Sequence, residues 1–109
     1  MHELSISRSV VEMCAERAMG AQVTRVTLVV GKLSAVLPDS LRFCFDICAE
    51  GTPVEGALLE IIEVPGLAVC RDCGGDVALT QLMGRCACGS VDLQLVAGEE
   101  LNVKEMEVA

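Results

Sequence analysis

Two closely spaced cysteine pairs constrain the fold of this 109-residue chain more than any other feature of its sequence. The pairs are Cys70 with Cys73 and Cys86 with Cys88, and a glycine directly follows each pair. Two thiolate pairs at this separation can close a tetrahedral site, and the glycines let backbone amides turn toward the sulfurs. The spacing therefore predicts that these four cysteines bind one structural zinc ion, with no open coordination position for catalysis.

Other interpretations of the cysteines stay open on the sequence alone. The four could be free buried thiols, or the CxxC pair could be a redox motif, which would require a helix N-terminus after a strand. The second pair and the glycines favour zinc, although its CxC spacing is one residue tighter than CxxC and predicts an altered turn. The other three cysteines, Cys14, Cys44 and Cys48, lie on predicted apolar helix faces and are interpreted as small buried hydrophobes.

The formal net charge of −8 limits the partners that the chain can bind. Contacts with nucleic-acid phosphates need clustered Lys and Arg, so we expect no nucleic-acid partner and no docking on an anionic membrane. No apolar run approaches the ~20 residues that span a bilayer. His2 and Glu3 stand where a signal peptide would be basic. We therefore expect a cytoplasmic chain, whose seven cysteines are metal ligands and thiols rather than disulfides.

Apolar periodicity predicts an α+β fold. Helical spacing covers residues 4–19, and a second helix opens at Pro38 and ends before Gly51. Strands are predicted where β-branched and apolar residues concentrate, over 23–30, 57–64 and 101–108. The expected architecture is a small three-stranded sheet with two helices, plus an inserted zinc ribbon.

The predicted domain boundaries follow from this architecture. Residues 1–65 and 99–109 form one α+β domain, and residues 66–98 form the zinc-binding domain. The ribbon is too short to build much of a core, so metal binding would contribute much of its folding energy.

The N-terminus is the one place where nitrogen donors can gather, because His2 is the single histidine of the chain. The amine of Met1 and the amide and imidazole nitrogens of His2 can chelate one metal, and Glu3 can supply a further donor. Deprotonated amides favour a square-planar metal, nickel(II) or copper(II). On spacing alone, a histidine at position 2 is usually a solvated terminal residue.

Three features together resemble the HypA/HybF family of nickel metallochaperones, which serve nickel–iron hydrogenase maturation. They are the MHE start, the CFD sequence of residues 44–46 after a proline-led helix start, and CxxC…CxCG followed by a strand ending in KEMEV. The resemblance covers nearly the whole chain. It departs from the family at the second cysteine pair, which is often CPxC and is here interrupted only by Ala87.

The resemblance implies transient nickel(II) at Met1, His2 and Glu3, and structural zinc at the four cysteines. It also implies delivery of nickel to a hydrogenase large subunit together with a GTPase partner, HypB. Asp39 could reach the nickel, or it could be a first-turn acid that the helix dipole favours. The oligomeric state and the nickel enzyme that is served are not implied.

Two other function classes fit the sequence less well than a metallochaperone does. A zinc-ribbon module for nucleic acid is disfavoured, because residues 66–98 have only Arg71 and Arg85 as cations and no aromatic residue for base stacking. An enzyme is disfavoured, because no second histidine is present to act as a base and the predicted metal site is closed.

Overall fold

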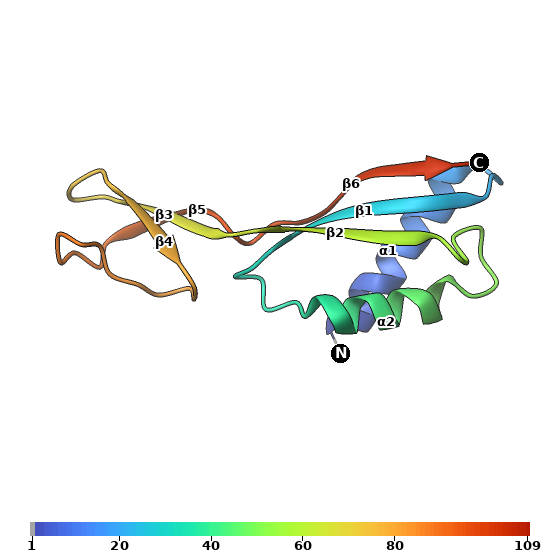
Figure 1. The fold of residues 1–109 in the computed structure, drawn as a ribbon, viewed down its shortest axis with the longest axis horizontal. Helices are drawn as coiled ribbons and strands as arrows, with labels where there is room; N and C mark the ends of the chain where they lie inside the picture. Colours follow the sequence, from blue (N-terminus) through green and yellow to red (C-terminus); the bar gives the residue numbers. More distant parts are fainter. Residues whose placement is uncertain (1) are drawn as a thin grey trace. The chain divides into compact units, whose positions relative to one another are not determined.

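The computed structural model describes residues 2–109, and Figure 1 shows the order of its helices and strands. The elements are α1 (His2–Ala18), β1 (Val23–Gly31), α2 (Pro38–Ala49), β2 (Leu58–Val64), β3 (Gly66–Cys70), β4 (Asp76–Leu79), β5 (Leu93–Ala97) and β6 (Leu101–Val108). The strands form two sheets, with the orders β2-β1-β6 and β4-β3-β5. The described chain divides into two compact units: a helical unit (2–28, 36–62 and 102–109) and a ribbon unit (29–35 and 63–101).

The helical unit has the predicted three-stranded sheet and two helices. Its core is aliphatic apart from one ring, and Val26, Leu28, Leu41, Phe45 and Val54 are each at most 1% exposed. The last strand pairs with β1, which confirms the predicted sheet. Helix α1 begins two residues earlier than predicted. The imidazole of His2 and the carboxylate of Glu3 therefore both lie in its first turn.

A buried hydroxyl joins the two helices. Ser7 on α1 is fully buried, and its Oγ donates a hydrogen bond to the carbonyl oxygen of Leu41 on α2 at 3.2 Å. Replacing Ser7 with alanine should lower the free energy of unfolding by about 1 kcal/mol, because the hydrogen bond is lost from a dry site. Urea unfolding followed by circular dichroism measures the change. Ser9→Ala is the matched control, since Ser9 is exposed on the same helix; equal stabilities for the two variants would contradict the prediction.

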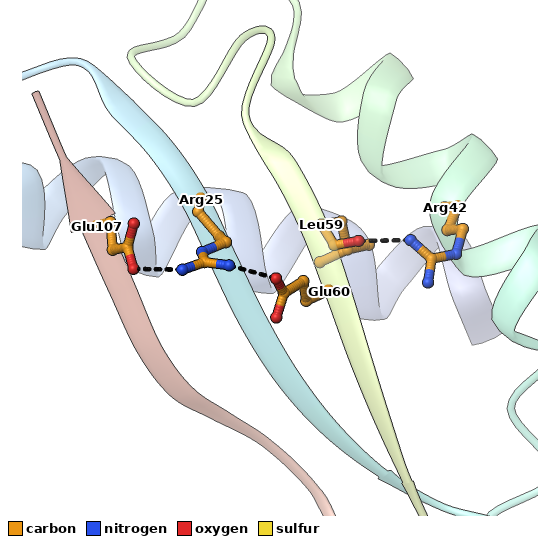
Figure 2. A network of polar contacts seen from close by, with 5 residues as sticks. All are labelled: Arg25, Arg42, Leu59, Glu60 and Glu107. Carbon is orange, nitrogen blue, oxygen red and sulfur yellow. Dashed lines mark hydrogen bonds and ion pairs between the residues drawn. The ribbon is translucent and has the colours of Figure 1, made fainter.

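The sheet of the helical unit has an open face that carries ion pairs. Figure 2 shows this face, with α1 passing behind the strands and Arg25 of β1 lying between Glu60 of β2 and Glu107 of β6. The distance from Arg25 Nη2 to Glu107 Oε2 is 2.7 Å. From α2, Arg42 donates to the carbonyl oxygen of Leu59 on β2. This contact occupies a backbone acceptor on an outer strand, which would otherwise be open to another strand.

The ribbon unit is built on β3, which pairs antiparallel with both β4 and β5. Its buried core consists of Leu33, Ala68 and Leu79, with Val77, Leu93 and Leu95 packed against it. Residues 29–35 belong to this unit, whereas the sequence-based boundaries place them with residues 1–65. The division into a nickel-binding and a zinc-binding domain stays a prediction. Within residues 2–109, no helix is long and apolar enough to cross a membrane.

Candidate metal centre

The structure brings the four cysteines of the sequence motif together in the ribbon unit. Cys70 ends β3 and Cys73 lies in the following turn, whereas Cys86 and Cys88 lie between β4 and β5. All four Sγ atoms lie within 4.8 Å of one another. The closest contacts join the two pairs, with Cys70 Sγ 3.7 Å from Cys88 Sγ and Cys73 Sγ 3.5 Å from Cys86 Sγ.

These separations fit a tetrahedral sulfur site. Four sulfurs at about 2.3 Å from a zinc ion are about 3.8 Å apart along each edge of the tetrahedron. All seven cysteines are free thiols, so no disulfide competes for the sulfurs. Four thiolates complete the tetrahedral set, and such a site has no coordination position left for a substrate.

Tight turns hold each cysteine pair. The amide of Gly74 donates to the carbonyl oxygen of Cys70 at 2.8 Å, and the amide of Gly89 donates to that of Cys86 at 2.9 Å. The second turn is one residue shorter, as its CxC spacing requires. Both glycines have positive φ, 77° at Gly74 and 95° at Gly89, a conformation that other residues rarely adopt.

The clustered thiols influence one another's ionisation. Backbone hydrogen bonds, the largest from Cys73, lower the pKa of Cys70 to about 6. The backbone of Ser90 lowers the pKa of Cys88, but hydrogen bonds to the thiols of Cys86 and Cys70 outweigh it and raise that pKa to about 12. The Cys70 thiolate therefore forms readily, whereas the raised pKa of Cys88 disfavours a second negative charge beside it. A soft divalent cation would remove this repulsion, so the donor set suits zinc.

Polar residues around the cysteines connect the two turns. Ser90 Oγ donates to Asp72 Oδ2 at 2.5 Å, and the amide of Asp92 donates to Ser90 Oγ at 3.1 Å. Arg71 Nε lies 3.4 Å from Asp92 Oδ1. No local sequence signal marks the contact between Ser90 and Asp72, because it depends on how β3 and β5 pair.

The three other cysteines lie in the helical unit. Cys14 is 2% exposed, which confirms its predicted burial, and this burial raises the pKa of its thiol. Cys44 and Cys48 are only half-buried, so their predicted burial is wrong in degree. The reason is the orientation of α2, which turns Leu41 and Phe45 into the core and leaves both thiols at the edge of the buried face.

The structure describes only part of the candidate nickel site at the N-terminus. Met1 lies outside the described residues, and His2 is exposed at the start of α1. Glu3 Oε2 accepts a hydrogen bond from the amide of Leu37 at 3.1 Å, and this bond lowers the pKa of Glu3. Asp39, in the first turn of α2, lines a surface groove together with Glu3.

Comparisons with known proteins match the whole chain to one family. Residues 1–108 match the family described as "Hydrogenase/urease nickel incorporation, metallochaperone, hypA". Hydrogenase maturation factors HypA from Trichormus variabilis and Geobacter sp. are 57% and 48% identical to the chain; each comparison covers 99% of this chain, and 96% and 99% of the relative.

The fold also matches that of solved proteins. The solution structure of the Ni metallochaperone HypA from Helicobacter pylori superposes with a TM-score of 0.68 at 26% identity, covering 97% of this chain and 96% of that one. A second solution structure, of HypA protein, gives a TM-score of 0.69 at 27% identity over 100% of this chain and 97% of that one. The chain therefore belongs to the HypA family of nickel metallochaperones, which are hydrogenase maturation factors and not enzymes.

Proposed function

We propose that the chain binds nickel(II) as cargo at Met1, His2 and Glu3 and delivers it to the large subunit of a nickel–iron hydrogenase. Delivery would proceed in cooperation with the GTPase HypB and in the cytoplasm. A structural zinc ion, bound by Cys70, Cys73, Cys86 and Cys88, would hold the ribbon unit folded. In this scheme residues 1–65 and 99–109 form the nickel-binding domain and residues 66–98 the zinc-binding domain.

The position of His2 carries the nickel part of the proposal. It is the single histidine of the chain, and it is exposed at the first position of α1. The first amides of an α-helix have no acceptor within the helix. Deprotonation of the His2 or Glu3 amide by a coordinated metal would therefore break no hydrogen bond of α1. Such amides are the donors that square-planar nickel(II) prefers.

The carboxylate of Glu3 has a separate role in the structure. It accepts a hydrogen bond from the amide of Leu37, the residue at the N-cap of α2. A carboxylate used in this way is a less available metal ligand, so Glu3 would contribute its backbone nitrogen first. Asp39 lies in the same groove and could approach a metal from α2, although its place in the first turn is also explained by the helix dipole.

Complementation tests the delivery part of the proposal. In a hydrogenase-producing strain that lacks its own copy of this gene, the chain should restore hydrogenase activity at low nickel, whereas His2→Ala should not. Added nickel should partly restore activity without the chain, because a higher metal concentration replaces assisted delivery by mass action. Hydrogenase activity that depends neither on the chain nor on the nickel concentration would contradict a role in nickel delivery.

A further inference from the structure

A side-chain hydrogen bond joins the two cysteine turns through residues outside the four-sulfur set. Asp72 lies between Cys70 and Cys73 in the first turn, and Ser90 lies two residues after Cys88 in the second. The side chains of the same two residues meet, because Ser90 Oγ donates to Asp72 Oδ2. The sulfurs of Cys70 and Cys88, which are 3.7 Å apart, belong to the same two turns.

Ser90 is fixed by hydrogen bonds of both its side chain and its backbone. Its hydroxyl donates to Asp72 and accepts from the amide of Asp92, so both of its hydrogen-bonding roles are used. Its carbonyl oxygen accepts from the amide of Cys86 at 2.9 Å. The residue is therefore fixed to the second turn through its backbone and to the first turn through its side chain.

We propose that Asp72 and Ser90 are positioning residues, which hold the Cys70 and Cys88 sulfurs at the separation that a tetrahedral metal requires. We call this hydrogen-bonded pair the Asp72–Ser90 clasp. It acts together with the metal, because it joins the same two turns that the four sulfurs join around an ion. The proposal rests on the proposed zinc site and adds to it the residues that control zinc retention.

The clasp can be tested because it and the charge of Asp72 predict opposite changes in zinc affinity when Asp72 is removed. Four thiolates around a divalent cation carry a net negative charge, so a nearby carboxylate repels the site. If Asp72 acted only through its charge, removing it would tighten zinc binding. If it acts through the clasp, removing it should loosen zinc binding, because groups that orient metal ligands typically contribute ~10–100-fold to affinity.

Zinc affinity and zinc release from the full chain, measured with a chromogenic chelator, distinguish these cases. We expect Ser90→Ala and Asp72→Ala each to weaken zinc binding and speed its release about tenfold, the low end of the range because Asp72 is exposed. Ser90→Thr keeps the hydroxyl and should behave as the wild type does. Asp76→Ala is the matched charge control, since it removes a carboxylate from the exposed start of β4.

A double-mutant cycle completes the test. Combining Ser90→Ala with Asp72→Ala should cost little more than either change alone, because both remove the same bond. Wild-type zinc release from both single variants, or tighter binding by Asp72→Ala, would overturn the clasp and leave the zinc assignment intact. A wild-type chain that takes up no zinc would overturn the zinc assignment and the clasp together. Nickel binding should be unchanged in every variant, which shows that the helical unit is folded.

Discussion

Replacing Cys73 with alanine is expected to unfold the ribbon unit while the helical unit stays folded. The buried apolar cluster of the ribbon unit consists of Leu33, Ala68 and Leu79 with three partly buried neighbours, a core too small to hold a unit of this size by apolar burial alone. Zinc binding to such sites contributes about 10–16 kcal/mol at neutral pH, and that energy is folding energy. With one thiolate missing, most of it should be lost.

The helical unit should survive because its core does not depend on the metal. Leu28, Leu41 and Phe45 are each at most 1% exposed, and none of them belongs to the ribbon unit. In amide-resolved NMR spectra of Cys73→Ala, signals from residues 63–101 should collapse toward random-coil positions. Signals from α1, α2 and β1 residues before Val29 should keep their wild-type dispersion.

Two controls separate loss of zinc from loss of a thiol. Cys48→Ala removes a half-buried thiol from α2 and should leave both the zinc content and the ribbon spectrum unchanged. Treating the wild type with a strong chelator should reproduce the Cys73→Ala spectrum without any mutation. If Cys73→Ala retained one zinc per chain and dispersed signals across 63–101, the ribbon would not depend on a four-sulfur site.

The elements of the helical unit could be predicted because their signals are local. Apolar spacing marks α1 and α2, Pro38 marks the start of α2, and β-branched residues mark β1. The start of α1 was missed by two residues, because no N-capping side chain precedes its apolar residues in the sequence. The half-burial of Cys44 and Cys48 was not predicted, because apolar spacing shows which face of α2 is buried but not how far the buried face extends around the helix.

In the ribbon unit, local sequence signals predict the cysteine cluster but not the strands or the tertiary contacts. The cysteine spacing named the four residues that the structure brings together, since each turn is formed by neighbours in sequence. The strands β3, β4 and β5 were not predicted, because short runs between glycines show no clear alternation. Leu33 joins this unit through a hydrogen bond from its amide to Gly98 and through burial against Ala68, and both contacts depend on the tertiary fold.

The other large effect is expected at the N-terminus, where two unlike changes should weaken nickel binding in the same way. His2→Ala removes the imidazole. A Gly-Ser extension before Met1 keeps every side chain but moves the terminal amine out of the chelate. Each change should reduce nickel affinity at least ~10–100-fold, because every lost donor opens a chelate ring. Isothermal titration calorimetry on untagged protein measures both.

The charge of the chain provides the competing explanation and the reason for using two variants. A surface that merely attracts cations through the net charge of −8 would lose little from either change, since the charge is almost unaltered. Glu3→Gln sharpens the comparison. It removes a carboxylate next to His2 but keeps the backbone nitrogen, so a chelate built on backbone amides should bind nickel nearly as well as the wild type does.

The pH dependence and the zinc content complete the argument. Nickel binding should weaken as the pH falls, because protons compete for the amine and imidazole nitrogens that coordinate the metal. Zinc content should stay constant in all three variants, since the four sulfurs lie in the ribbon unit. If the extended chain binds nickel as tightly as the native one, the amine is not a ligand. If His2→Ala also binds normally, the proposed nickel site at Met1, His2 and Glu3 is wrong, and the metal must be sought among the carboxylates of Glu3 and Asp39.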